Sequence, residues 1–264
     1  MVNKFYYLCG LPRAGNTLFA SLMNQNPKIS VTANSIVCSL FCGSNMLKKS
    51  DIYLNYPDSE SLNNVTRNIF KNYYSHWKAD YIIDRSMWGL PEHLEILKEF
   101  APNKVKIIVL VRDIKEILAS FIKFSYSNET NYIARNGRTL EERCDYVMAN
   151  GGELHRWIRA VYNLTKPENM DYVHLIEYND LINNTKDELN KVYDYLNIPK
   201  FEHKLNNLIQ LSNNNIEYND TILGGQLHTI KTDNISKSNF DRKNYLPNDV
   251  DTRYNTDSFW GKNN

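Results

Sequence analysis

Short apolar segments alternate with longer segments of helical periodicity along most of the chain. The apolar segments are rich in isoleucine, valine and tyrosine, which is typical of buried strands. They cover residues 4–9, 81–84, 105–111 and 172–176. Helical spacing of apolar residues is found over residues 16–26, 62–77, 91–100 and 114–124. Because strands that alternate with helices form parallel sheets covered by helices, the pattern predicts an α/β fold with a central parallel sheet.

Two of the helical segments have a recognisable apolar face, which we expect to lie in the core. In the first segment this face is formed by Leu62, Val65, Ile69, Tyr73 and Trp77. In the second it is formed by Ile114, Ile117, Leu118 and Phe121.

The rest of the chain is predicted to be mainly helical. One long helix is expected over residues 140–164 and another over 185–196, which ends before Pro199. Residues 212–247 are polar and weakly periodic, and a segment of that length without periodicity is more often functional than an ordinary connection. The sequence has no evident linker or repeat, so we predict a single domain over residues 1–264.

Composition and charge limit the classes of partner. The chain has 31 basic and 30 acidic residues, so its bulk charge indicates neither nucleic acid nor an anionic membrane as a partner. No stretch approaches the roughly 18 consecutive apolar residues of a membrane span, and no secretory signal precedes the first strand. We therefore expect a soluble, cytoplasmic protein in which any anion site is local.

The four cysteines are Cys9, Cys38, Cys42 and Cys144. Only Cys38 and Cys42 are close in the sequence, and no histidine follows them at the spacing of a zinc motif. We expect them to be buried, reduced thiols. The sequence also shows no cluster of carboxylates or histidines suited to a metal ion, so no metal is predicted.

The first predicted strand is followed by the loop GLPRAGNT and then by a helix. This arrangement directs backbone N–H groups and the positive end of a helix dipole at one point, which suits an anion. Gly10 and Gly15 allow tight turns, Arg13 adds charged donors, and Asn16 and Thr17 are placed to cap the helix or contact a ligand oxygen. The alternative is an ordinary glycine-bearing turn with a surface arginine. The glycine spacing is also that of a nucleotide-triphosphate P-loop, but Asn16 stands where that motif has lysine.

A second candidate site follows the strand at residues 105–111. Arg112 stands at the carboxyl end of this strand, and Ser120 follows eight residues later on the next helix. Ligands of open parallel sheets bind at the carboxyl ends of the strands. The pattern therefore places both residues at the edge of the sheet where a ligand is expected.

The PRAGNT loop and the pair of Arg112 and Ser120 resemble the two signatures of the sulfotransferases that use 3'-phosphoadenosine 5'-phosphosulfate (PAPS). Both elements occur in the family's order and in the family's strand-loop-helix context. The likeness is greatest to bacterial and phage-type members with LPRSGSTL loops, and it extends over nearly the whole chain. It implies a P-loop-like three-layer fold and in-line transfer of a sulfuryl group from PAPS to a hydroxyl group. The product of PAPS would be 3'-phosphoadenosine 5'-phosphate (PAP), and no metal would be required.

The resemblance implies that the loop from Pro12 to Thr17 holds the 5'-phosphosulfate. Ala14 replaces the family's usual serine, so one hydroxyl contact is missing and we expect weaker or water-mediated binding there. Arg13 is expected at the leaving oxygen, because its charge is permanent and it can bind two oxygens at once. The expected contacts come from Arg13, Gly15, Asn16 and Thr17.

Arg112 and Ser120 are implied to hold the 3'-phosphate, and Tyr178, in the segment IEYNDL, to lie beside the adenine. A core tyrosine near a strand end is the alternative for Tyr178. The tail from residue 212 to 264 is implied to fold over the co-substrate.

The tail residues Lys231 and Lys237 are implied to meet the 3'-phosphate. A solvated lysine-bearing loop is the alternative for both residues.

The base that accepts the proton of the acceptor hydroxyl is not fixed by the resemblance. Family members often have their base after the second strand, where this chain has Asp84 and Arg85. We expect Asp84 as one candidate base, with Arg85 assisting at the sulfuryl oxygens. A structural pair of charges is the alternative. His228, in the tail, is the second candidate.

Two other functions stay open. A P-loop-like kinase or nucleotidase would need carboxylates for magnesium, a role for which Asp113 is available. A non-catalytic relative would bind the nucleotide or a partner without turnover. The acceptor of a sulfotransferase is not encoded in a recognisable motif, so a small molecule such as a phenol, a carbohydrate, a lipid or a peptide hydroxyl all remain, and the oligomeric state is open.

Overall fold

The computed structural model describes residues 4–32, 34–210, 216, 218–230, 233, 235, 241–246, 248–254 and 259–261. Its centre is a five-stranded, all-parallel sheet with the strand order β2-β3-β1-β4-β5. The strands are β1 (Lys4–Leu8), β2 (Ile29–Val31), β3 (Tyr81–Arg85), β4 (Ile107–Val111) and β5 (Val173–Glu177). The parallel sheet and the four strands predicted from apolar runs are therefore confirmed.

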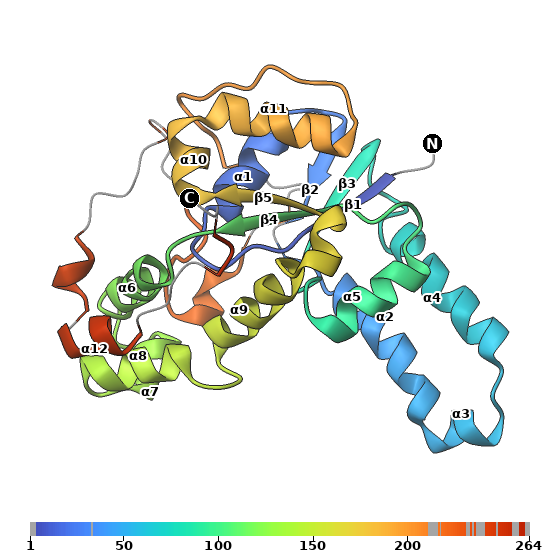
Figure 1. Cartoon of the computed structure of the whole chain (residues 1–264), viewed down its shortest axis with the longest axis horizontal. Coiled ribbons are helices and arrows are strands. Elements are labelled where there is room, and N and C mark those ends of the chain that lie inside the picture. The colour runs from blue at the N-terminus through green and yellow to red at the C-terminus, as the bar shows by residue number, and fades with distance from the viewer. Residues whose placement is uncertain are drawn as a thin grey trace.

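Helices cover both faces of the sheet, which gives three layers (Figure 1). The strands are apolar along nearly their whole length because neither face meets water, and every residue of β4 is buried. This is the predicted P-loop-like three-layer α/β architecture. One face carries α1 (Asn16–Met23), α10 (Tyr178–Asn183) and α11 (Thr185–Leu196). The other face carries α5 (Pro91–Phe100) and α9 (Glu153–Leu164).

The edge strand β2 was not predicted from the sequence. It has only three residues, which is too short for a pattern of alternation to be visible. It forms because β3 offers a free edge, and it pairs there from Ile29, opposite Tyr81, to Val31, opposite Ile83.

Three helices form an arm that projects from the sheet (Figure 1). Helix α4 packs against α2 in this arm and buries Thr66 and Phe70. The predicted core face of this segment is wrong at Val65, which is 57% exposed. The reason is that α4 packs mainly on α2 and meets β1 through Phe70, near its carboxyl end, so that a narrower stripe of the helix is covered. The arm consists of α2 (Val37–Met46), α3 (Asp51–Asn55) and α4 (Ser59–Tyr73).

The predicted long helix over residues 140–164 is two helices, α8 (Leu140–Met148) and α9. Gly151 interrupts the pattern with a positive φ of 79°, a left-handed conformation that favours glycine and cannot continue a helix. By contrast, the core face predicted for the fourth helical segment is confirmed in α6 (Ile114–Ser125), where all four of its residues are buried.

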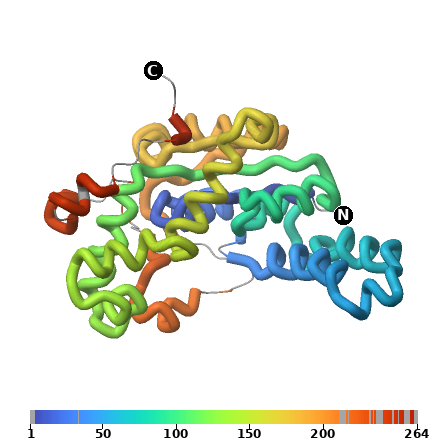
Figure 2. The backbone as a smooth tube through the Cα atoms, turned by 60° about the horizontal axis from the view of Figure 1, so that its bottom comes forward, coloured from blue at the N-terminus to red at the C-terminus, as the bar shows by residue number. Residues whose placement is uncertain are grey.

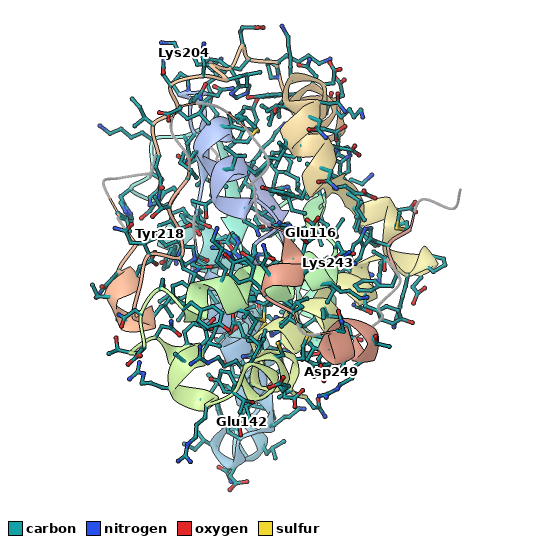
Figure 3. All side chains as sticks on the ribbon, turned by 90° about the vertical axis from the view of Figure 1, so that its left-hand side faces the viewer. Glu116, Glu142, Lys204, Tyr218, Lys243 and Asp249 are labelled. Carbon is teal, nitrogen blue, oxygen red and sulfur yellow. The ribbon has the colours of Figure 1, made fainter. Side chains whose placement is uncertain are left out.

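The tail returns to the carboxyl ends of the strands. The tail passes beside the segment before α7 (Tyr132–Asn136) (Figure 2). Here Asn128 Nδ2 donates to the Gly224 carbonyl oxygen at 2.9 Å. Farther along the tail, the short helix η5 (Arg242–Asn244) packs against α6. Figure 3 shows Lys243 of η5 near Glu116 of α6. The tail therefore crosses the edge of the sheet at which a ligand is expected.

The four cysteines are buried and free, as predicted. None of the helices in the described part of the chain is long and apolar enough to cross a membrane.

Candidate active site

The loop between β1 and α1 is held in a conformation that only certain residues adopt. Gly15 has a φ of 87°, which glycine adopts freely, and Arg13 has a φ of 61°, which is uncommon for a residue with a side chain. A left-handed arginine is a local strain of the kind that gathers at functional sites. A Cβ atom at Gly10 would lie 2.1 Å from Asn16 Oδ1, so only glycine fits there.

The amino end of α1 has no side-chain cap. Of the two roles expected for Asn16 and Thr17, capping the helix is not observed, because each side chain is engaged elsewhere. Asn16 Nδ2 donates to the Leu11 carbonyl oxygen at 2.7 Å, and Thr17 forms a hydrogen bond with the side chain of Tyr218. The first N–H groups of an uncapped helix are open donors, and they add to the positive end of its dipole.

Two arginines and a serine meet beside this loop. Arg13 Nε donates to Ser120 Oγ at 3.0 Å, and its Nη1 donates to the Leu227 carbonyl oxygen in the tail. Arg112, which is 7% exposed, donates from Nη1 to the Arg13 carbonyl oxygen and from Nε to Glu116, at 2.9 and 3.0 Å. Burial lowers the pKa of Arg13, and the nearby charge of Arg112 lowers it further. The cluster therefore favours an anion that would offset two adjacent positive charges.

Tyr178 packs against both Arg112 and the loop at Gly15. The guanidinium of Arg112 lies over the Tyr178 ring, 4.3 Å from the ring centroid. A Cβ atom at Gly15 would lie 3.2 Å from the same ring, so the tyrosine also fixes the loop. The aromatic ring thus holds Arg112 flat at the carboxyl end of β4, as cation–π contacts do elsewhere.

A third arginine comes from the end of β3. Arg85 is 7% exposed, its Nη1 donates to Asn34 Oδ1, and its guanidinium lies 5.0 Å from the centroid of the Trp157 ring. Burial lowers the pKa of Arg85 below its ordinary value, although an arginine stays charged at neutral pH. Its register partner in β1 is Leu8, so Arg85 stands beside the start of the loop.

These side chains line one cavity of about 270 Å³, close to the lower end of the range for small-molecule sites. Three arginines enter it, and none of its described lining residues is Asp or Glu. Asp113 is absent from this lining, because it caps α6 by accepting from Glu116 N. The residues predicted for a ligand that line the cavity are Pro12, Arg13, Gly15, Asn16, Thr17, Arg85, Arg112, Ser120, Tyr178 and His228.

Asp84 lies outside the cavity. Its side chain is 0% exposed and accepts hydrogen bonds from Trp88 Nε1 at 2.9 Å, from Ser35 Oγ at 2.5 Å and from the hydroxyl of Tyr74. Burial raises the pKa of Asp84, while these donors stabilise its charge. In the strand, Arg85 points to the cavity and Asp84 to the opposite face, because successive side chains alternate. This position does not support Asp84 as the base.

His228 lies at the mouth of the cavity and has a carboxylate partner that the sequence did not suggest. Asp220 Oδ1 lies 2.6 Å from His228 Nδ1, and Asp220 Oδ2 accepts from the backbone N–H groups of Leu227 and His228. The Tyr218 ring stacks on the imidazole, with centroids 4.1 Å apart and an interplanar angle of 4°. Nδ1 therefore carries a proton donated to Asp220, and no described residue is a hydrogen-bond partner of Nε2.

The pKa of His228 is lowered, first because burial disfavours the imidazolium. Asp220 opposes this effect, whereas the charges of Arg85 and Arg13 add to it. The ring is therefore neutral at pH 7, with a lone pair on Nε2 that can accept a proton.

Of the residues predicted in the first loop, Ala14 does not line the cavity. Ala14 is fully buried and absent from the cavity lining, so the position of the missing serine hydroxyl is occupied by core packing. Lys231 and Lys237 lie outside the described residues.

A second cavity adjoins the first and shares His228 and Thr229 with it. It measures about 650 Å³ and is lined mainly by polar residues of the tail and of the segment before α7. His228 thus lies between the arginine-lined cavity and a roomier polar one.

A comparison with protein families decides what this chain is. The family described as the sulfotransferase domain matches residues 7–256, which is nearly the whole sequence. The chain belongs to the sulfotransferase family. In this sulfotransferase the segments that follow β1 and β4 bring Arg13 and Arg112 together, because Arg112 Nη1 donates to the Arg13 carbonyl oxygen.

Solved structures support the fold of this sulfotransferase. The sulfotransferase domain of the olefin synthase of Synechococcus PCC 7002 matches with a TM-score of 0.53 and 15% identity, over 86% of this chain and 84% of that one. A sulfotransferase from Alicyclobacillus acidocaldarius matches with a TM-score of 0.51 and 14% identity, over 77% and 85%. No curated protein matches the sequence.

Two residues of the candidate site were missed in the sequence of this sulfotransferase. Tyr218 and Asp220 lie in a polar stretch without periodicity, and their importance depends on a turn that brings them back to His228. The only available signal was the length of that stretch, which marked it as functional without indicating individual residues.

Proposed function

We propose that this sulfotransferase transfers the sulfuryl group of PAPS to an acceptor hydroxyl by in-line displacement. The observation that carries the proposal is the cavity lined by Arg13, Arg85 and Arg112 without a described Asp or Glu. Arg85 ends β3 and Arg112 follows β4, the two strands that flank β1. Their backbones are separated by two strand spacings, roughly 10 Å, across the sheet and by four residues along it, because Leu8 is level with both Arg85 and Ile108. A nucleotide with anionic groups at both its 5' and 3' positions suits such a distribution of charge.

We assign the residues of the cavity to the two ends of the nucleotide. In this assignment the amino end of α1, Thr17 and Arg85 bind the 5'-phosphosulfate, and Arg112 and Ser120 bind the 3'-phosphate. Tyr178, already stacked under Arg112, offers an apolar surface for the adenine. PAPS supplies a sulfuryl group that is activated by its phosphate leaving group.

Arg13 connects the two ends of the site. Its guanidinium contacts Ser120 and the Leu227 carbonyl oxygen, and we expect it to exchange this carbonyl for the oxygen that gains charge as the sulfuryl group leaves. Removing one preorganised donor from such a position typically lowers the rate by about 100-fold or more. Arg13→Ala is therefore expected to lower kcat by that factor.

His228 is proposed as the base, in place of Asp84. Its Nδ1–H is held by Asp220, so Nε2 has the lone pair that accepts the proton of the acceptor hydroxyl. The second cavity, which shares His228, gives room for the acceptor. Its polar lining favours an acceptor with several hydroxyl or amide groups over a purely apolar lipid.

The described part of the tail supports its proposed role as a cover for the co-substrate. Residues 227–230 and Ile235 contribute to the lining of the arginine cavity. The tail would then exclude water from the sulfuryl group, and it would bring the base with it.

Binding of PAP tests the proposal first. At 100 times its dissociation constant, a ligand of the folded state adds about 2.7 kcal/mol to stability. For a chain of this size, that corresponds to a rise in melting temperature of roughly 5 to 10 °C. We expect this rise with PAP and not with magnesium-ATP, because no described carboxylate lines the cavity to hold the metal.

Variants make the test specific. Arg112→Ala and Ser120→Ala are expected to abolish the rise with PAP, whereas the exposed Arg138→Ala keeps it. A rise with magnesium-ATP alone would overturn the proposal in favour of a kinase. A rise with PAP, but no turnover of PAPS over a broad panel of hydroxyl acceptors, would instead indicate a non-catalytic relative.

A further inference from the structure

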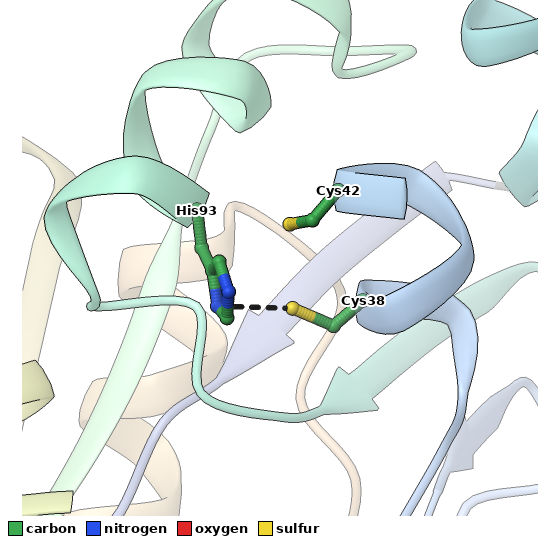
Figure 4. A group of neighbouring side chains, drawn as sticks. All are labelled: Cys38, Cys42 and His93. Atoms are coloured by element: carbon green, nitrogen blue, oxygen red, sulfur yellow. Dashed lines mark hydrogen bonds between the residues drawn. The ribbon is translucent and has the colours of Figure 1, made fainter. Parts of the chain in front are cut away.

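Two cysteines and a histidine from different helices meet on the side of the molecule that carries α2 and α5 (Figure 4). Cys38 and Cys42 belong to α2, and His93 belongs to the first turn of α5. Their possible ligand atoms all lie within 4.8 Å of one another. In the described part of the chain, this is the one group of three or more such side chains close enough to share a metal ion. It is separate from the arginine-lined cavity.

The fold explains why these side chains converge. Residues four apart on a helix lie on the same face, so α2 directs both sulfur atoms toward α5, against which it packs. Cys38 is 2% exposed and Cys42 is 9% exposed, so neither thiol is an ordinary surface group. The sequence predicted no zinc motif, since a histidine that arrives from a distant helix leaves no spacing pattern.

The imidazole is held in an orientation suited to a ligand. His93 Nδ1 lies 2.9 Å from the Met87 carbonyl oxygen, and because a carbonyl only accepts, Nδ1 carries the proton. Nε2 then keeps its lone pair. A metal-binding histidine usually donates its other N–H to a carboxylate or a backbone carbonyl in this way.

The three side chains are already close together, with possible ligand atoms within 4.8 Å of one another. Sulfur and nitrogen ligands of a tetrahedral zinc ion lie roughly 3.5 to 3.8 Å from one another, given the usual zinc–sulfur and zinc–nitrogen distances. Cys38 Sγ lies 3.3 Å from His93 Nδ1, the nitrogen that carries the proton, so ligation through Nε2 requires the ring and the two cysteine side chains to rotate.

The chemistry of the group selects the kind of ion. Thiolate and imidazole ligands favour zinc and other thiophilic metals over magnesium or calcium. Two thiolates neutralise a divalent ion, which suits a buried position.

We propose that Cys38, Cys42 and His93 form a binding site for one zinc ion, with a water molecule in the fourth position. The ion would join α2 to α5. Both helices are connected to residues around Arg85. Asn34, four residues before Cys38, accepts a hydrogen bond from Arg85. Met87, whose carbonyl oxygen contacts His93, follows Arg85 by two residues. A zinc ion there would hold together the two segments that position Arg85.

The test uses the full chain, first treated with a reductant and a chelator and then titrated with Zn²⁺ or Co²⁺. We expect one equivalent of either ion to bind, and Co²⁺ to show the near-ultraviolet charge-transfer band of cobalt–thiolate bonds. Since loss of a residue that merely supports a ligand costs 10- to 100-fold in metal affinity, Cys42→Ser and His93→Gln are expected to weaken Zn²⁺ binding by at least about 100-fold. His93→Gln lies in a half-buried position, which keeps the test informative if a cysteine variant fails to fold.

Cys144→Ser is the matched control, because Cys144 is also a buried, free thiol but lies in α8. It should bind Zn²⁺ and Co²⁺ as the unaltered chain does. The proposal is overturned if the reduced protein binds less than one equivalent, if Co²⁺ shows no thiolate band, or if Cys144→Ser loses binding to the same degree. None of these measurements involves PAP, so the proposed sulfuryl transfer is tested separately.

Discussion

Asp220 fixes the orientation of the His228 ring together with the stacked ring of Tyr218. This carboxylate fixes the ring through Nδ1 and fixes the backbone beneath it through two N–H groups. It also stabilises the imidazolium, so it raises the pKa of His228 against the lowering by burial and by Arg85. Asp220 does not line the arginine cavity but lines the second one, so in the proposed reaction it would act through His228 and border the space for the acceptor.

Asp220→Asn should separate these effects. Without the carboxylate, the pKa of His228 falls further, so the acid limb of the pH dependence of kcat should move to lower pH. At the same time kcat should fall by at least about tenfold, because the ring loses its tautomer and its orientation. The kcat and its pH dependence are measured with an acceptor from the panel that gives turnover. The affinity for PAP should change by less than about threefold.

Asp187→Asn provides the control for Asp220→Asn, because Asp187 is exposed on α11. Asp187→Asn should leave the pH dependence of kcat unchanged. An Asp220→Asn variant whose acid limb stays where it was, or moves to higher pH, would argue against His228 as the proton acceptor.

At the scale of elements, the turn between β1 and α1 depends on the absence of a side chain at Gly10. A Cβ atom there would lie 2.1 Å from Asn16 Oδ1 and 3.0 Å from Leu110 Cβ. Gly10→Ala is therefore expected to lower the free energy of unfolding by about 1–3 kcal/mol, the usual cost of overpacking. Because the displaced turn carries Arg13, the affinity for PAP should also fall, by about tenfold.

Gly43→Ala is the natural comparison for Gly10→Ala in thermal and denaturant unfolding. Gly43 lies inside α2, and nothing lies within 4 Å of an added Cβ atom. Alanine there should raise stability by about 0.5–1 kcal/mol, since glycine is a poor helix former. Equal effects of the two substitutions would contradict the explanation.

The elements that the sequence predicted are those whose pattern is local. The strand β4 and the helix α5 are apolar or periodic over their whole length, and α5 has the predicted bounds. The loop with Arg13 and the pair of Arg112 and Ser120 were identifiable because the ends of parallel strands gather at one edge. The residues that were missed or misplaced depend on distant contacts. Asp84 could be excluded as a base only from the donors around it, and Asp220 is recognisable only beside His228.

At the scale of the whole molecule, one site draws on four strands. Arg13 follows β1, Arg85 ends β3, Arg112 follows β4 and Tyr178 follows β5. A ligand that contacts the ends of all four strands binds only when the sheet is intact, so its binding stabilises the four strands together. With PAP at 100 times its dissociation constant, we therefore expect hydrogen exchange of the buried amides to slow in all four strands together.

Helix α3, at the far end of the arm, serves as the internal reference for this exchange experiment. It has no buried residue and lies away from the site, so its exchange should be the same with and without PAP. Protection limited to residues 10–17 would show that the nucleotide engages only the first loop, and would argue against the shared site.

The proposed donor site and the proposed acceptor site lie on different parts of the fold, which matters for engineering acceptor specificity. The groups proposed for the donor nucleotide stand mainly on strand ends, whereas Tyr218, Asp220 and most of the polar second cavity stand on residues 216–230 and the facing segment before α7. A library of variants confined to the lining of that cavity, with Asp220, His228 and Thr229 retained, should therefore yield new acceptor preferences at unchanged affinity for PAP. Selection for a new product could then proceed in this protein without rebuilding its core.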